Sequence, residues 1–202
     1  MEFIGRQECK VKPLRIQRRV FRDSSRELTR GEYEKLVSTA IELGKARLAL
    51  TLETICATGI RVSELKFITA EAALRGRAEI ALKGKIRTIM IPNKLCRKLL
   101  KYAKKQKIAS GEIFLTGSGK SISRKQIWAE MKALCRKAGI DAGKVFPHNL
   151  RHLFARCFYR VCRDIVRLAD VLGHSSIETT RIYLISSGIE HERTLERLQL
   201  IS

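Results

Sequence analysis

Acidic residues are scarce in this 202-residue chain, because 20 Asp and Glu stand against 41 Lys and Arg and leave a formal net charge of +21. Long apolar runs are missing too: no window approaches 18 uninterrupted apolar residues, which excludes a membrane span. Met1–Lys12 is charged throughout, so we expect no signal peptide and a cytoplasmic protein. The 45% of hydrophobic residues nevertheless allow a folded core, which excludes a wholly disordered basic tail.

Several chemical motifs are also missing. None of the six cysteines forms a C-x-x-C pair, so neither a zinc site nor a disulfide framework is indicated, and we expect reduced thiols. The phosphate-binding pattern G-x-x-x-x-G-K-[ST] is not present, and no pair of carboxylates is placed to hold Mg²⁺. We therefore expect no metal and no cofactor.

The large positive charge indicates a polyanionic partner. Nucleic acid is the commonest such partner, with anionic lipid and the ribosome as alternatives. Between Ile80 and Gly111 there are ten basic residues and no acidic one, and Lys10–Arg22 is a second basic segment without a clean helical period. The residues predicted to contact DNA are Arg18, Arg19, Lys85, Arg87, Lys94, Lys98, Lys101 and Lys105.

Hydrophobic periodicity and capping signals predict a mainly α protein with one small antiparallel β-sheet, an α+β class. Thr29-x-x-Glu32 is a capping box, and Gly59 ends a helix that has Leu48, Leu52 and Ile55 on its inner face. The predicted hairpin spans 77–91, and the other predicted helices span 62–67, 94–107, 123–138, 147–162, 164–172, a short segment capped by Ser175-x-x-Glu178, and an amphipathic tail at 189–200.

Three clusters of polar residues stand out. On the helix opened by Pro147, His148 lies one turn from Arg151 and His152, so the three can share a face beside a helix N-terminus that favours an oxyanion. The second cluster is Thr58–Leu65, in which Glu64 can hold the guanidinium of Arg61. The third runs from Leu172 to Ser176 and contains His174, with Tyr183 nine residues later. Each cluster alone has a plain structural explanation; together they form a phosphate-reactive set suited to an oxygen nucleophile.

The sequence resembles the tyrosine recombinases of the phage integrase family, close to Xer-like and conjugative-transposon integrases. The resemblance covers 27–202 and rests on ATGIRVSEL, the hairpin lysine, HNLRH, LGHSSIETT and the following IY. It implies the catalytic-domain fold of that family and a site-specific recombinase that cuts and rejoins double-stranded DNA through a 3′-phosphotyrosyl intermediate. The residues that match the family's catalytic positions are Arg61, Lys83, His148, Arg151, His174 and Tyr183, with Glu64 at an acidic position that assembles the site.

The chain departs from the family pattern in two places. The hairpin turn is one residue short, which leaves Lys83 and Lys85 as alternatives for the general acid, and we favour Lys83. Residues 1–26 correspond only to a basic linker and the tail of a missing core-binding domain. The resemblance also implies a monomer that becomes a homotetramer on DNA through a C-terminal helix with Ile189, Leu195 and Leu198, in the bacterial nucleoid. Packing of that helix on its own domain is the alternative.

Two other functions remain open on the sequence. One is a non-catalytic DNA-binding remnant of a recombinase, and the other is strand relaxation of the type IB topoisomerase kind.

Overall fold

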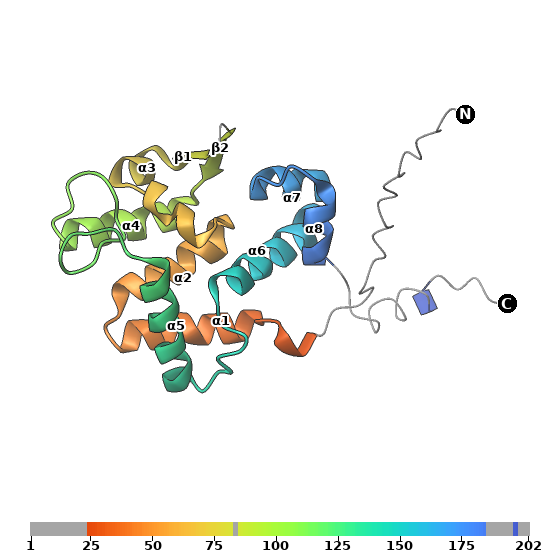
Figure 1. Ribbon diagram of the computed structural model, residues 1–202, viewed down its shortest axis with the longest axis horizontal. Helices are drawn as coiled ribbons and strands as arrows, with labels where there is room; N and C mark the ends of the chain where they lie inside the picture. Colours follow the sequence, from red (N-terminus) through yellow and green to blue (C-terminus); the bar gives the residue numbers. More distant parts are fainter. Residues whose placement is uncertain (1–23, 83–84, 185–195, 198–202) are drawn as a thin grey trace, which may run out of the picture. The chain divides into compact units, whose positions relative to one another are not determined.

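Helices supply most of the secondary structure, with one β-hairpin (Figure 1). The structure, a computed structural model, describes residues 24–82, 85–184 and 196–197; the side chains at 24, 82, 85 and 182–184 fall outside that description. The α-helices are α1 (Arg30–Glu42), α2 (Ala46–Thr58), α3 (Ala70–Arg75), α4 (Asn93–Lys105), α5 (Arg124–Ala138), α6 (Pro147–Cys162), α7 (Ile165–Leu172) and α8 (Ile177–Leu184). Two short 3-10 helices, η1 (Ser24–Arg26) and η2 (Val62–Phe67), and strands β1 (Arg77–Leu82) and β2 (Lys85–Met90) complete the list. This confirms the predicted fold class.

The capping signals act as expected. The amide of Glu32 donates to Thr29 Oγ1 at 3.2 Å, and the Thr29 amide donates back to Glu32 Oε2 at 2.8 Å, which confirms the capping box of α1. Gly59 ends α2 in the left-handed conformation, as predicted. Glycine has no Cβ to clash there, so the chain can turn sharply at that point into η2.

Two local features differ from the predictions. Helix α3 was not anticipated, although Thr69 accepts from the amide of Ala72 at 3.1 Å and so caps it. Helix α8 begins at Ile177, and Ser176 rather than Ser175 accepts from the amide of Glu178, at 3.2 Å. The predicted cap was therefore wrong by one residue, because two adjacent serines offer the same hydroxyl and only the backbone path selects one.

The main core surrounds α2. Leu48, Leu52 and Ile55 are at most 2% exposed, which confirms the predicted inner face. Helix α2 packs against α1, α4, α5 and α6, and α5 and α6 lie beside it in Figure 1. A smaller cluster of Ala155, Leu168 and Leu172 joins α6 to α7. These two clusters hold the ends of α2, α6 and α7 in place, and the polar site described below lies on those ends.

The hairpin is a two-stranded antiparallel sheet whose register runs from Arg77 opposite Met90 to Leu82 opposite Lys85. Ile80 and Ile89 are buried, so one face of the hairpin packs on the core. Lys83 falls between the two strands and outside the described residues. Most of the predicted linker at 1–26 also lies outside the described residues, as does the predicted tail at 189–200 apart from Glu196 and Arg197. The domain boundaries remain predictions.

Cysteines 56, 96, 135, 157 and 162 are free thiols in the described part of the chain. Within the same residues, no helix is long and apolar enough to cross a membrane.

Candidate active site

Arg151 lies at the centre of the site and is only 2% exposed. It projects from α6, and its Nη1 donates to the carbonyl oxygen of Gly59 at 2.5 Å. Its Nη2 donates to the carbonyl of Leu172 at 2.7 Å and lies 2.9 Å from Nε2 of His174. A single guanidinium therefore joins the C-terminal ends of α2 and α7, and its planar shape with several N–H donors allows this.

His174 lies between two polar partners. Its Nδ1 is 2.9 Å from the hydroxyl of Thr180, and its Nε2 faces Nη2 of Arg151. Because a guanidinium can only donate, Nε2 must accept, and the proton of the neutral ring sits on Nδ1. Burial, together with the nearby positive charges of Arg151, Arg61 and Arg87, lowers the pKa of His174 to about 4.

Glu64 holds Arg61. Its side chain is 1% exposed; Oε1 accepts from Nη1 of Arg61 at 3.0 Å and Oε2 accepts from the Arg61 amide at 2.7 Å. The Arg61 side chain stays 45% exposed, so part of its guanidinium faces solvent. The sharp turn at Gly59 and the start of η2 place Arg61 beside the end of α2, where Arg151 is also bound.

Arg87 differs from its predicted location on an open basic surface. Its side chain is only 16% exposed, and its Nη2 lies 2.5 Å from Oε2 of Glu64. Its Nη1 donates to the carbonyl of Val171 at 3.1 Å. Burial lowers the pKa of Arg87, while the negative charge of Glu64 raises it. A run of like charges in the sequence does not reveal that one of them contacts a buried carboxylate. The predicted contact between Arg87 and DNA stays a prediction.

His148 is exposed on the first turn of α6. Its ring centroid lies 4.5 Å from that of His152 in an edge-to-face arrangement, and His152 is itself 5% exposed. His148 contributes to the lowered pKa of His174, which places it within electrostatic reach of that ring.

Position 183 lies on α8, three residues after Thr180, and its side chain is outside the described residues. Thr180 is fully buried and bonded to His174. The helix that carries Tyr183 is therefore attached directly to the cluster. The sequence placed His152 beside His148 and Arg151, but it did not indicate Thr180 or the contact between Arg87 and Glu64. For Thr180 the repeated Thr after Glu178 was the only signal.

The cluster is strongly positive. Arg61, Arg87 and Arg151 carry three positive charges, Glu64 carries one negative charge, and His174 is neutral, so these five residues sum to +2. In the described part of the chain, no group of three His, Cys, Asp or Glu side chains is arranged to hold a metal ion. Donors of this type, gathered around a partly exposed guanidinium, suit a phosphodiester.

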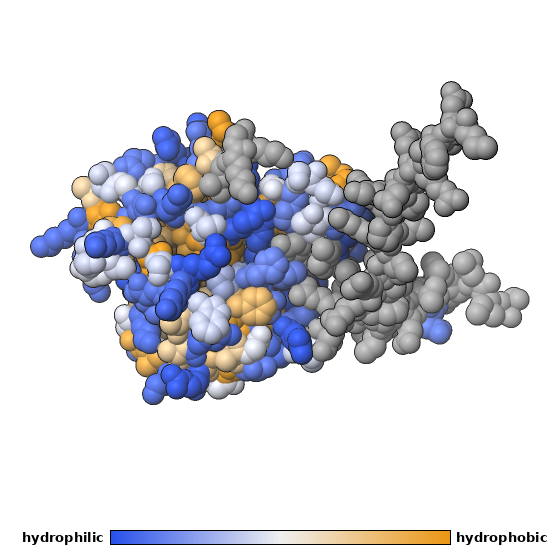
Figure 2. Space-filling view, in the orientation of Figure 1, coloured by the Kyte–Doolittle hydropathy of each residue, from blue (hydrophilic) through white to orange (hydrophobic). Residues whose placement is uncertain are grey.

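The predicted DNA-contacting lysines of α4 lie on its outer side. Lys94, Lys101 and Lys105 are exposed, whereas Lys98 forms an ion pair with Glu53 and is 42% exposed. Hydrophilic residues cover much of the face seen in Figure 2. Arg18 and Arg19 lie outside the described residues, and of Lys85 only the backbone, at the start of β2, is described.

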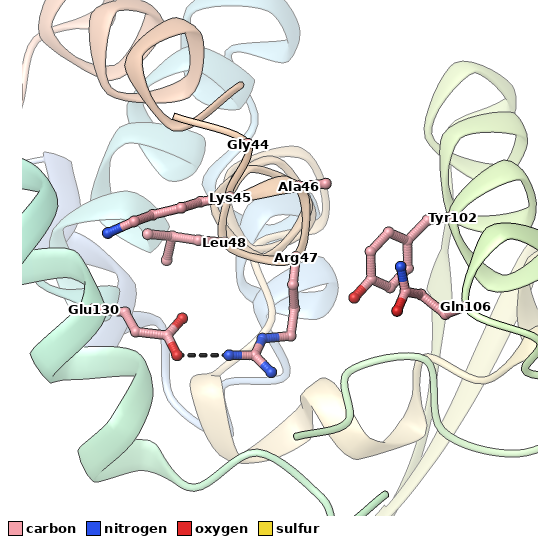
Figure 3. Close-up of a pocket in the computed structure, with 8 residues that line it drawn as sticks. All are labelled: Gly44, Lys45, Ala46, Arg47, Leu48, Tyr102, Gln106 and Glu130. Atoms are coloured by element: carbon pink, nitrogen blue, oxygen red, sulfur yellow. Dashed lines mark hydrogen bonds and ion pairs between the residues drawn. The ribbon is translucent and has the colours of Figure 1, made fainter. Parts of the chain in front are cut away.

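A separate hollow of about 410 Å³ lies between the start of α2, the end of α4 and α5 (Figure 3). Arg47 crosses it to reach Glu130 at 2.6 Å and donates to the carbonyl of Leu115 at 2.8 Å. None of the predicted site residues lines this hollow. Its polar groups bind helices α2 and α5 to each other and to the loop before α5.

Comparison with known proteins finds relatives over most of the chain. The chain is 33% identical over 181 residues to tyrosine recombinase XerA of Pyrococcus furiosus, covering 86% of this chain and 62% of that protein. It is 29% identical over 168 residues to tyrosine recombinase XerD of Rhizobium meliloti, covering 80% of this chain and 54% of that one. The chain thus spans somewhat more than half the length of these relatives.

Solved structures share the fold. The crystal structure of XerA recombinase superposes with a TM-score of 0.72 at 23% identity, over 87% of this chain and 64% of that one. The Tn1549 transposon integrase in complex with transposon right end DNA gives a TM-score of 0.67 at 16% identity, over 87% of this chain and 66% of that one. The model of the phage integrase family matches residues 26–188. This chain belongs to the phage integrase family.

Proposed function

We propose that this chain carries the catalytic domain of a site-specific tyrosine recombinase that cleaves and rejoins double-stranded DNA. The observation that carries the proposal is the single positive cluster in which Arg151 contacts His174 and Glu64 holds a half-exposed Arg61. Relatives named tyrosine recombinases, and a solved transposon integrase in complex with DNA, support it.

In the proposed reaction the phenol oxygen of Tyr183 attacks a backbone phosphorus. The new O–P bond forms as the bond to the 5′-oxygen breaks, which leaves a 3′-phosphotyrosyl link and a free 5′-hydroxyl. Forming the phenolate at pH 7 costs about 4 kcal/mol, so a base is needed, and exposed His148 is the candidate for taking the proton. Lys83 is the candidate for protonating the 5′-oxygen as it leaves.

Arg61 and Arg151 would bind the two non-bridging oxygens of that phosphate, whose negative charge grows in the transition state. Oriented donors of this kind are worth about 3–4 kcal/mol each. An incoming phosphate oxygen would replace His174 Nε2 as the acceptor of Arg151. The His174 ring, with its pKa raised by the anion, would then donate to the phosphate. A 5′-hydroxyl of a partner strand reverses the first step, so the bond energy is conserved in the protein–DNA link.

Assembly and location belong to the same proposal. We expect a monomer in the absence of DNA and a homotetramer on DNA that forms through the segment around Ile189, Leu195 and Leu198, in the bacterial nucleoid. Light scattering of the chain with and without a DNA duplex measures this directly. A stable tetramer without DNA contradicts it.

Covalent capture tests the reaction. The chain is incubated with a pool of nicked duplexes whose central region is randomised, and protein-linked DNA is recovered on a denaturing gel and sequenced. We expect an adduct that leaves a free 5′-hydroxyl, and none with Tyr183→Phe, which should still shift DNA on a native gel. An adduct from Tyr183→Phe removes Tyr183 from this role.

Two further outcomes decide between functions. DNA binding by the wild-type chain without any adduct favours a non-catalytic remnant. Relaxation of a supercoiled plasmid without exchange between two sites favours a topoisomerase-like activity. Arg151→Ala should lower the cleavage rate far more than it lowers DNA affinity, and an equal loss in both makes Arg151 a docking residue only.

A further inference from the structure

Arg87 is the one described residue of the hairpin whose side chain reaches two other parts of the site. Its Nη2 binds Oε2 of Glu64, 23 positions earlier, at 2.5 Å, and its Nη1 binds the carbonyl of Val171, 84 positions later, at 3.1 Å. Only 16% of the side chain is exposed, so Arg87 is a largely buried residue and not a surface charge. It therefore connects strand β2 to both η2 and the end of α7.

Gly173 provides the space that Arg87 occupies. Its φ is +64°, and a Cβ built on it would lie 2.5 Å from Cδ and 2.7 Å from Nη1 of Arg87. Those distances are shorter than any non-bonded carbon contact, so the guanidinium end of Arg87 is seated against the Gly173 backbone. His174, which faces Arg151, is the next residue.

The last turn of α7 is shared by two guanidinium groups. Consecutive carbonyls accept from different arginines: Val171 from Arg87 and Leu172 from Arg151. The C-terminal end of a helix carries a partial negative charge, which stabilises both. On the other side, the carboxylate of Glu64 accepts from Arg61 and from Arg87. Arg61 and Arg151, the two proposed phosphate ligands, are thus connected to each other through Arg87.

We propose that Arg87 is a positioning residue, which through Glu64 holds Arg61 at a fixed place relative to Arg151 and His174. By the same contacts it fixes the position of the hairpin that carries Lys83. Its effect on DNA cleavage rests on the proposed function, but its role in connecting Glu64 to the end of α7 does not. A lysine cannot replace it, because one ammonium cannot reach both a carboxylate and a helix carbonyl in the planar geometry of a guanidinium.

The first test separates positioning from DNA contact. Single-turnover formation of the covalent adduct at saturating DNA and the Kd for the same duplex are measured for Arg87→Lys and Arg87→Met, well below their melting temperatures. We expect the cleavage rate to fall at least tenfold in both variants, with Kd changed less than twofold. Arg136→Met, which removes an exposed arginine from α5, is the matched control and should leave both values unchanged. A weaker Kd with an unchanged rate at saturation overturns the proposal and makes Arg87 a DNA-contacting residue.

The second test does not need cleavage. Melting temperatures are compared for Arg87→Met, Glu64→Gln and the double variant. If Arg87 and Glu64 stabilise the protein through their mutual contact, the melting temperature of the double variant falls by less than the sum of the two single decreases. Additive decreases overturn the proposal. Should Arg87→Met fail to fold, Arg87→Lys takes its place in the cycle. A wild-type chain that forms no adduct speaks against the proposed function, and the thermal cycle still decides the role of Arg87.

Discussion

Nη2 of Arg151 donates a hydrogen bond of 2.9 Å to Nε2 of His174, so the proton of the neutral imidazole lies on Nδ1, which faces Thr180. This relationship gives the DNA-free site a definite protonation state. It also couples Arg151, the proposed phosphate ligand, to His174. A group that takes the place of His174 as the acceptor of Arg151 changes the electrostatic environment of the His174 ring.

His174 should stay neutral across the ordinary pH range. Its folded-state pKa is about 4, below the value of about 6.5 for an unfolded histidine, so between these values the unfolded chain binds more protons. Stability from His174 is therefore fully present above pH 6.5 and is lost as the pH falls towards 4. We expect an NMR titration of its ring to show a midpoint near 4 without DNA and a higher one with a DNA duplex, since a phosphate favours the charged ring.

The control for that titration is His174→Gln. The difference in unfolding free energy between wild type and this variant should shrink as the pH falls from 6.5 to 4. A wild-type midpoint near 6.5, or a difference that does not depend on pH, contradicts the buried neutral ring.

Gly59 and Gly76 provide a matched pair of helix-ending glycines. Both have left-handed φ values, +65° and +70°, but a Cβ at Gly59 would lie 2.4 Å from the Phe154 ring, whereas nothing lies within 4 Å at Gly76. Gly76→Ala should cost only the backbone penalty of about 1–2 kcal/mol. Gly59→Ala should cost about 2–3 kcal/mol more, because the ring must also move. Urea unfolding of both variants measures this, and equal losses would show that the contact with Phe154 relaxes freely.

The general acid can be assigned by changing the leaving group. A substrate with sulfur in place of the 5′-bridging oxygen releases a thiolate, which needs no proton because a thiol has a pKa of about 8.5. We expect Lys83→Ala to cleave ordinary DNA slowly and the sulfur substrate at nearly the wild-type rate. For Lys85→Ala we expect no such rescue: its cleavage rate relative to wild type should be the same on the sulfur substrate as on ordinary DNA. Rescue of Lys85→Ala instead would assign the role to Lys85.

The basic face of α4 should be visible in the salt dependence of DNA binding. Exposed Lys101 is predicted to contact a phosphate, so Lys101→Ala should lower the slope of log K against log salt by about 0.9. Lys98→Ala should change it less, because Glu53 already neutralises that ammonium. Fluorescence anisotropy between low and moderate salt measures the slopes. Exposed Lys137 on α5 serves as the control, and a similar drop for Lys137→Ala would mean that α4 is no special DNA-binding face.

The sequence by itself determined the local structure and the set of chemically active residue types. Thr29 and Glu32 cap α1, Gly59 ends α2, and the apolar spacing of Leu48, Leu52 and Ile55 identifies the inner face. Each of these signals acts over a few residues, within one turn or one helix face, so no knowledge of the fold was needed. The order of the motifs was likewise enough to indicate the family.

Only the tertiary structure decided how distant groups share partners. Arg151 binds the carbonyl of Gly59 across 92 positions, and Arg87 meets Glu64 across 23, inside a run of basic residues that looked uniformly exposed. The tertiary structure also decided which of two adjacent serines caps α8, and it placed the Thr180 hydroxyl against His174. The physical reason is that a charged side chain is buried only where the fold brings it a carboxylate or a helix end, and a sequence pattern carries no record of that meeting.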